Sequence, residues 1–302
     1  MVKTFFQWVV WPLCLAANTA PVVAAALFAP QALSQVAAVT TVLLSGVLLI
    51  TEQLLPYRAD WSIRGDREIW RDIGHAVVYA ALAVHAARLL FLVVLADVLS
   101  SLNVADVFGI WPSKSPVWLQ IALVIIVGDA LEYGYHRWSH TSSVLWRVHA
   151  IHHTPVRLHA LKGGRHHFLY AFGRGVVVWL PLLVIGAPAE LVYWQFVAET
   201  ITGLGGHANI EFKIPWLMHR LAVTPAFHRL HHAADSQLGN SNFGVVLPFW
   251  DMICGTHSDP LTIAVADTGI QDDPIPRRFV EELKSPVTYG RLIAHGQQGR
   301  VE

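Results

Sequence analysis

Long apolar runs dominate the first half of the chain. Four of them cover residues 5–28, 36–55, 73–99 and 117–135, and short polar segments connect them. Each run approaches the ~20 residues that a helix needs to cross a bilayer. The first run is too long for the apolar core of a signal peptide and another run follows directly, so we interpret it as a retained span. Residues 1–135 are therefore predicted to form mainly transmembrane helices, about four in number.

A further apolar stretch covers residues 176–201, and Gly186 and Pro188 interrupt it midway. Each half is short for a membrane span, which favours a re-entrant or interfacial hairpin that returns to its own side. Two full spans are the alternative. The hairpin interrupts a histidine-rich catalytic region at 136–260, and a polar C-terminal tail follows at 261–302. We therefore expect a single, all-α integral membrane domain, capped by a cytoplasmic helical metal-binding region.

Composition agrees with a membrane protein and excludes other classes. The chain has 302 residues, of which 54% are hydrophobic and 14% charged, whereas a typical soluble domain carries about 25% charged residues. Its 21 basic and 21 acidic residues give a formal net charge of +0, so no global basic field is available to bind nucleic acid. Only Cys14 and Cys254 are present, which supports neither a disulfide framework nor a cysteine-rich zinc site.

Basic residues in the connecting segments predict the orientation. The loop after the second apolar run contains four arginines, Arg58, Arg64, Arg67 and Arg71, whereas Lys114 is the only basic residue in the loop after the third run. Lys and Arg concentrate in cytoplasmic loops. We therefore expect the arginine-rich loop, both chain termini and the histidine-rich region to lie on the cytoplasmic side.

Histidines gather after the fourth apolar run, where 13 of the 17 lie between His136 and His232. Spacings of three and four residues place the side chains of each group on one side of a helix. Neutral imidazole is the commonest metal ligand, and an all-nitrogen set suits iron, copper or zinc better than calcium or magnesium. The strongest candidate ligands are His136, His140, His149, His152, His153, His207, His228, His231 and His232.

A second set of polar residues is expected to ligate metal directly or to hold the ligands in place: His159, His166, His167, Asp129, Glu132, Asn209 and Asp251. Asp129 and Glu132 precede His136 by seven and four residues, so all three share one helix face. Metal-bound imidazoles usually donate their other N–H to a carboxylate or carbonyl, which favours the supporting role for these carboxylates.

The remaining histidines are expected to serve no metal. The isolated residues His219, His257 and His295 are interpreted as surface or core histidines. His75 and His85 lie within the third apolar run, where ionisable side chains usually face a bundle interior or a watery cavity. We expect these two to make polar contacts between helices.

The order of the motifs resembles the fatty acid hydroxylase superfamily, which includes sterol desaturases and methylsterol oxidases. The resemblance covers roughly residues 120–260 and rests on His136-x-x-x-His140, His149-x-x-His152-His153, His207-Ala-Asn209, His228-x-x-His231-His232, Asn242-Phe243-Gly244 and Trp250-Asp251. It implies an integral-membrane, non-haem di-iron enzyme that uses O₂ to hydroxylate or desaturate a lipid, with histidines as the ligands of two iron ions.

Departures from the family pattern refine this expectation. The His-Pro-Gly-Gly motif of a fused haem domain of the cytochrome b5 type is absent from the sequence, so electrons are expected from a separate donor protein. Many relatives have Arg-x-His-Pro after the second histidine box, where this chain has Arg165-His166-His167-Phe168. Gly203 stands four residues before His207, in place of an extra histidine ligand found in some relatives.

Three other functions are weighed against a lipid hydroxylase. Desaturation by the same family needs a second hydrogen to be positioned, so hydroxylation is preferred. A zinc-dependent membrane hydrolase usually has about three protein ligands to the metal, and the H-E-x-x-H and Gly-x-Ser-x-Gly motifs are absent. A metal transporter would place its ligands near the bilayer midplane, whereas these histidines follow the spans.

Overall fold

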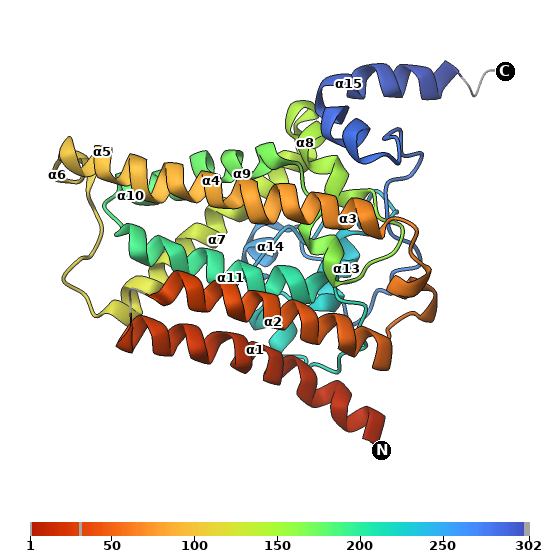
Figure 1. Ribbon diagram of the computed structural model, residues 1–302, viewed down its shortest axis with the longest axis horizontal. Coiled ribbons are helices and arrows are strands. Elements are labelled where there is room, and N and C mark those ends of the chain that lie inside the picture. Colours follow the sequence, from red (N-terminus) through yellow and green to blue (C-terminus); the bar gives the residue numbers. More distant parts are fainter. Residues whose placement is uncertain (1, 30–31, 299–302) are drawn as a thin grey trace.

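The computed structural model describes residues 2–29 and 32–298, and within these ranges the chain is helical with no β-strand. The described residues include the four predicted helices that are long and apolar enough to cross a membrane: Thr4–Ala26, Gln35–Leu54, Ile69–Ser101 and Val117–Thr141. They belong to α1 (Val2–Phe28), α2 (Leu33–Leu54), a continuous helix from α3 to α5, and α7 (Val117–Thr141). Figure 1 shows them packed as one bundle.

The third span is a single helix with two π-helical segments. α3 (Ile69–His75), α4 (Val84–Arg88) and α5 (Ala96–Ser101) alternate with η4 (Ala76–Ala83) and η5 (Leu89–Leu95). π-Helical turns accommodate extra residues and are frequent at functional sites. Here η4 carries Tyr79 and Ala80 to the wall of a cavity beside the histidines.

The predicted apolar hairpin is present, but its arms are longer than the apolar stretch. One arm is α9 (Phe168–Arg174), η7 (Gly175–Trp179) and α10 (Leu180–Val184), and the other is α11 (Ala189–His207). Gly186 forms the turn with φ 93°, a conformation that favours glycine. The Ile185 carbonyl accepts the N–H groups of Ile110 and Trp111 at 3.1 Å each. The tip of the hairpin thus meets the connection between the third and fourth spans, which also contains α6 (Val104–Phe108).

The hairpin packs closely on the third span. A Cβ added at Gly175 would lie 2.2 Å from the ring of Phe91, so only glycine allows the two helices to approach this closely. Val178 and Leu182 on the hairpin join Ala87 and Phe91 in one buried hydrophobic cluster. The same arm of the hairpin also packs on α7 through η7.

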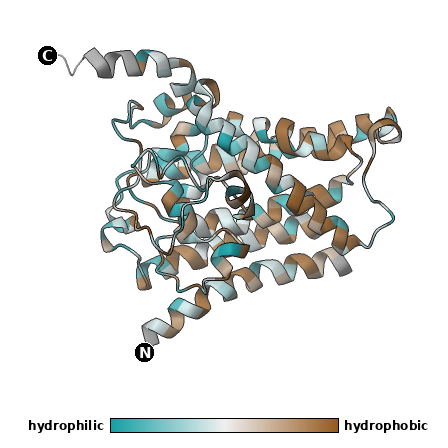
Figure 2. Cartoon of the chain, turned by 180° about the vertical axis from the view of Figure 1, so that it is seen from behind, coloured by the Kyte–Doolittle hydropathy of each residue, from teal (hydrophilic) through white to brown (hydrophobic). Residues whose placement is uncertain are grey.

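Shorter helices gather at the other end of the bundle. They are α8 (Ser143–His153), η6 (Ala160–Gly164), α12 (Met218–Leu221) and α13 (Pro225–His231). α14 (Phe249–Cys254) packs against α7 nearer the middle of the bundle (Figure 1). Pro225 opens α13, and the Thr224 hydroxyl caps it by accepting the N–H of Phe227 at 3.4 Å. Hydrophilic loops concentrate at this end, where the chain also begins and ends (Figure 2).

The segment 261–302, described above as a polar tail, includes a 20-residue helix, α15 (Phe279–Gln298). α15 packs on α8 and α3, and the indole N–H of Trp146 donates to the hydroxyl of Tyr289 at 2.8 Å. The buried Glu282 side chain anchors the start of α15 in the interior. A polar composition therefore conceals a helix held by specific polar contacts rather than by a broad apolar face.

Candidate metal centre

Four helices bring the nine strongest histidine candidates to one place. α7 continues beyond its apolar run and carries His136 and His140 in its last turns. Ser142 then ends α7 and caps α8, so the chain reverses sharply. α8 therefore faces α7 with its own histidines, and α13 and the end of α11 complete the arrangement.

The nine histidines form two groups. Within each group, the candidate ligand atoms all lie within 4.8 Å of one another. The first group contains His136, His140, His149, His153 and His231, and the second contains His152, His207, His228 and His232. Each H-x-x-H-H motif is divided between the groups. Its first and last histidines are four residues apart and enter one group, while the middle histidine enters the other.

The nitrogen spacing fits metal coordination better than hydrogen bonding. The Nε2 atom of His232 lies 3.1 Å from that of His207, of His152 and of His228. A neutral imidazole carries one N–H, so such converging nitrogens cannot all pair with one another. Metal–nitrogen bonds of about 2.1 Å at right angles leave the two nitrogens about 3 Å apart. The first group has the same spacing, with 3.1 Å between Nε2 of His136 and His149.

Backbone carbonyls hold several rings by their other nitrogen. Nδ1 of His136 lies 2.7 Å from the carbonyl oxygen of Phe243, and Nδ1 of His231 lies 2.8 Å from that of Ser241. Nδ1 of His207 lies 2.7 Å from the carbonyl oxygen of Gly203. If Nδ1 carries the proton, Nε2 presents its lone pair to a metal. The Nε2 atom of His231 is buried without a hydrogen-bond partner, as a ligand nitrogen is expected to be. These backbone partners were not predicted, because any residue type supplies a carbonyl.

Burial keeps the histidines outside the spans neutral. Desolvation lowers the pKa of His149, His152, His153, His228, His231 and His232 well below the usual value, and neighbouring histidines lower it further. Neutral imidazole is the form that binds metal. The folded chain therefore offers these six side chains as ready ligands at neutral pH.

Asp129 and Asp251 support the first histidine group indirectly, through the backbone. Asp129 accepts the backbone N–H groups of Val246 at 2.8 Å and Leu247 at 2.9 Å. Asp251 accepts those of Phe243 at 2.8 Å and Gly244 at 2.7 Å. Both carboxylates thus fix the backbone that presents the Phe243 carbonyl to His136.

Asn209 lies outside both groups and joins the end of α11 to the loop after α2. Its Oδ1 accepts the N–H of Arg58 at 2.9 Å, and its own N–H donates to Glu52 at 2.8 Å. His167 is equally removed from the histidine groups. Its Nδ1 accepts the N–H of Leu169 at 3.2 Å and caps α9, while Nε2 lies 3.0 Å from the Leu283 carbonyl.

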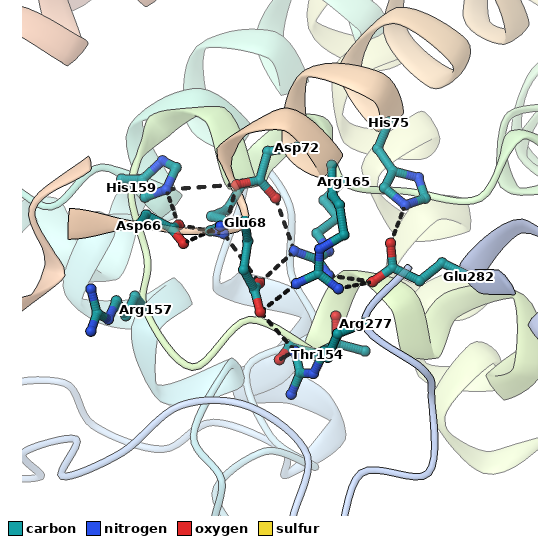
Figure 3. Close-up of polar contacts among 12 residues, drawn as sticks. Asp66, Glu68, Asp72, His75, Thr154, Arg157, His159, Arg165, Arg277 and Glu282 are labelled. Atoms are coloured by element: carbon teal, nitrogen blue, oxygen red, sulfur yellow. Dashed lines mark hydrogen bonds and ion pairs between the residues drawn. The ribbon is translucent and has the colours of Figure 1, made fainter. Parts of the chain in front are cut away.

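A third cluster, Asp66, Asp72 and His159, also has the spacing of a metal site. Figure 3 shows the three side chains converging, with Nε2 of His159 2.9 Å from Asp66. However, the ammonium of Lys162 lies 2.8 Å from Asp66 and 2.6 Å from Asp72. The buried ammonium of Lys162 thus occupies the position that a metal ion would take between these carboxylates. His159 belongs to this ion cluster and to neither histidine group.

The ion cluster continues to α15 and fixes the segment after the second histidine motif. Arg165 donates to Asp72 at 2.9 Å and to Glu282 at 2.6 Å (Figure 3). Nε2 of His75 lies 3.0 Å from Glu282, which confirms the predicted polar contact of His75 between helices. His85, in contrast, is exposed, and its Nδ1 lies 3.1 Å from the Ala80 carbonyl of its own helix. That prediction was wrong for His85, because its helix face lies outside the bundle.

The other histidines set aside by the sequence also lie apart from the two groups where the structure describes them. Nδ1 of His219 is 2.8 Å from the Thr224 hydroxyl, and the ring of His257 packs 5.8 Å from that of Phe227. The side chain of His295 lies outside the described residues.

A cavity of about 210 Å³ adjoins both histidine groups. Its wall includes His136, His149, His152, His207 and His228, together with His166, which stacks on His152 at 3.9 Å between ring centroids. Glu132, Arg174 and Glu199 line it as well. Arg174 pairs with both carboxylates, and its Nε lies 2.8 Å from Glu132. Glu132 therefore faces the cavity as part of a buried ion cluster, and His166 forms its wall without joining either group.

A bundle of candidate membrane spans that ends in two histidine groups with the spacing of metal ligands is the arrangement expected of a membrane protein that could hold metal. The fatty acid hydroxylase family profile matches residues 121–256. The ornithine lipid hydroxylase OlsE of Rhizobium tropici is 30% identical over 245 residues, which cover 80% of this chain and 72% of that protein. The chain belongs to the fatty acid hydroxylase superfamily and is an oxidoreductase.

Other relatives share a shorter region. Alkylglycerol monooxygenase of Xenopus tropicalis is 25% identical over 48% of this chain and 31% of its own length. Methylsterol monooxygenase 1-3 of Arabidopsis thaliana is 24% identical over 48% of this chain and 50% of its own length. The chain therefore spans half or less of these two relatives. No solved structure is significantly similar to it.

Proposed function

We propose that the protein is a membrane-bound, non-haem di-iron hydroxylase that oxidises a C–H bond of a lipid with O₂ and external electrons. The observation that carries the proposal is the convergence of nine histidines in two adjacent groups beside a cavity within a membrane bundle. Relatives named as lipid hydroxylases and monooxygenases support the same chemistry.

The two histidine groups would each hold one iron ion. The first ion would bind to His136, His140, His149, His153 and His231, and the second to His152, His207, His228 and His232. When bound, the iron pair supplies the activation of O₂ that abstraction of hydrogen from an unactivated carbon requires. An all-nitrogen ligand set suits iron, and it leaves the supporting carboxylates Asp129 and Asp251 free to hold the backbone.

The cavity would take the reacting part of the lipid. Its volume of about 210 Å³ exceeds the ~150 Å³ of an engineered cavity that holds benzene, so a segment of a lipid fits and a whole acyl chain or sterol does not. Thr41 of α2 and Thr200 of α11 also line it. The rest of the substrate would stay among the bundle helices or in the bilayer.

The reaction would consume one lipid C–H bond, O₂, two electrons and two protons, and would yield a lipid alcohol and water. Electrons would come from a separate donor protein on the cytoplasmic side. The arginine-rich loop supports this orientation, because Lys and Arg concentrate in cytoplasmic loops. The Tyr57 N–H donates to the Asn209 carbonyl at 3.1 Å, so the loop lies at the histidine end of the bundle. One electron donor could then reach the metal centre without crossing the membrane.

The deciding experiment supplies ¹⁸O₂ to membranes that contain the protein and follows the lipids by mass spectrometry. We expect one labelled oxygen in a lipid product and two iron ions per active chain. Loss of two hydrogens without label would show the alternative, desaturation. Product formation unchanged without oxygen would exclude both reactions, and bound zinc with hydrolytic turnover would favour the hydrolase. Metal binding without any turnover of lipid would favour a transporter.

A further inference from the structure

Part of the histidine-bearing region lies beside the middle of a membrane span. Asp129 is the thirteenth of the 25 residues of α7, and it accepts the N–H groups of Val246 and Leu247. α14 begins at Phe249, two residues after Leu247. At its far end, the Thr256 hydroxyl lies 2.9 Å from that of Tyr133, one turn along α7 from Asp129. α14 therefore packs against α7 between the levels of Asp129 and Tyr133.

The surface of α7 indicates where this level lies in the bilayer. Arg137 and Trp138 are exposed, with Trp138 55% accessible. Tryptophan and basic side chains gather at membrane interfaces. At about 1.5 Å per residue, Tyr133 and Asp129 lie up to about 8 and 14 Å along α7 from Trp138, toward the interior of the span. This places α14 below the interface, at the depth of acyl chains.

α14 presents an apolar face there. Phe249 is 48% and Ile253 61% accessible, and Cys254 is exposed beside them. The one charged residue of α14, Asp251, is buried and holds two backbone N–H groups. On α7, Ile126 is also exposed, with 42% of its surface accessible. Figure 2 views the molecule from the side of α14, which lies at the centre.

The backbone around α14 is suited to that depth. Irregular backbone is tolerated within a bilayer only where its polar groups are satisfied inside the protein. Val246 and Leu247 donate to Asp129, Phe243 and Gly244 donate to Asp251, and the Val246 carbonyl accepts the N–H of Val223 at 2.9 Å. The two carboxylates thus satisfy four backbone donors in a segment that an aqueous cap would leave to water.

We propose that the segment 242–254 dips into the bilayer and that the face of α14 formed by Phe249, Ile253 and Cys254 contacts lipid acyl chains. The occupant is lipid because the face is apolar and exposed, and because α14 packs beside a candidate spanning helix at the level of its interior. The segment that orients His136 through the Phe243 carbonyl is then embedded in the membrane. This inference does not depend on the reaction that the metal centre performs.

The test attaches a small environment-sensitive fluorophore to a cysteine at residue 253 in the metal-loaded protein, reconstituted in phosphatidylcholine nanodiscs. The variant is Ile253→Cys in a Cys254→Ser background, and the background alone reports labelling of the buried Cys14. Ile126→Cys, on the outer face of α7, is the lipid control. Gln237→Cys, exposed in the polar loop after α13, is the water control. Aqueous iodide and lipids with a nitroxide on the acyl chain serve as quenchers.

We expect the label at residue 253 to behave like that at residue 126, with several-fold weaker iodide quenching and stronger acyl-nitroxide quenching than at residue 237. Iodide quenching equal to that at residue 237 would overturn the proposal. Shielding from both quenchers, with energy transfer between labelled copies, would instead show that a second copy of the chain covers the face, and would overturn it too. Metal content equal to that of the unlabelled protein checks that each variant is folded.

Discussion

At the scale of single residues, neutral buried imidazoles are the feature from which the proposed chemistry follows. Spacing along the helices identifies the side chains, and burial keeps those on α8 and α13 unprotonated. Backbone carbonyls hold the rings of His136, His207 and His231, and Asp129 and Asp251 hold the backbone next to His136. Loss of a ligand and loss of a support should therefore have different effects.

His232→Ala should remove a central ligand of the second group, since its Nε2 contacts three other Nε2 atoms at 3.1 Å. We expect loss of about one metal ion per chain and loss of turnover by at least about 100-fold. Metal analysis and lipid product formation measure the two effects. His85→Ala is the matched control, because His85 is exposed on the third span and should change neither. Full metal content in the His232 variant would argue against this ligand assignment.

Asp129→Asn should weaken metal binding without removing a ligand. An amide accepts less strongly than a carboxylate from the N–H groups of Val246 and Leu247, so the Phe243 carbonyl would be less firmly placed. We expect a loss of affinity of about 10-fold or more, as for other outer contacts of metal ligands, measured by competition with a chelator. Asp235→Asn is the control, since Asp235 also accepts two backbone N–H groups but in an exposed loop. Equal affinities in the two variants would contradict this role.

At the scale of elements, the chain positions its helices by polar contacts as much as by apolar packing. α15 is joined to α3 and to the segment after η6 through Glu282, which accepts from His75 and Arg165. The same ion cluster fixes the residues that lead to His166 and the cavity. Buried ion pairs of this kind contribute little net stability but are costly to break, because the remaining charges stay buried.

Glu282→Ala should therefore destabilise the protein by about 3 to 5 kcal/mol, since the buried Arg165 guanidinium loses one of its partners. The neighbouring Glu281→Ala provides the control. Glu281 pairs with Lys284 at 3.1 Å on the surface, and an exposed pair contributes about 1 kcal/mol or less. Thermal unfolding in nanodiscs would compare the two variants. Equal midpoints would show that α15 is not held through Glu282.

At the scale of the whole molecule, the bundle has two different ends. One end carries the histidine groups, the arginine-rich loop and the polar loops (Figure 2). The other carries the connection between the third and fourth spans and the tip of the hairpin. We infer that the first end faces the cytoplasm, where an electron donor protein could dock.

This orientation predicts the accessibility of two loop positions to a cysteine reagent that cannot cross membranes. Ser113→Cys, in the exposed loop before α7, should react from outside intact cells in a Cys254→Ser background. Gln237→Cys, at the histidine end, should react only after the membrane is opened. Reaction of both positions from outside, or the reverse pattern, would contradict the orientation.

The sequence by itself determined the four apolar helices that could span a membrane, the helical hairpin and which nine histidines are candidate ligands, because apolar run length and helical spacing are local properties of the chain. It also separated His75 from the ligand candidates. Only the tertiary structure decided which histidines share a group, since His152 and His153 are adjacent in sequence but lie in different groups. His149 and His153 face His136 and His140 of α7, whereas His152 faces His207 and His232. The tertiary structure also decided what the two carboxylates bind. Asp129 accepts from backbone N–H groups more than 100 residues away in the chain, and Asp251 from groups about eight residues away. The position of α14 beside α7 was equally beyond the sequence, because Asp129, which accepts from the backbone just before α14, lies more than 100 residues away in the chain.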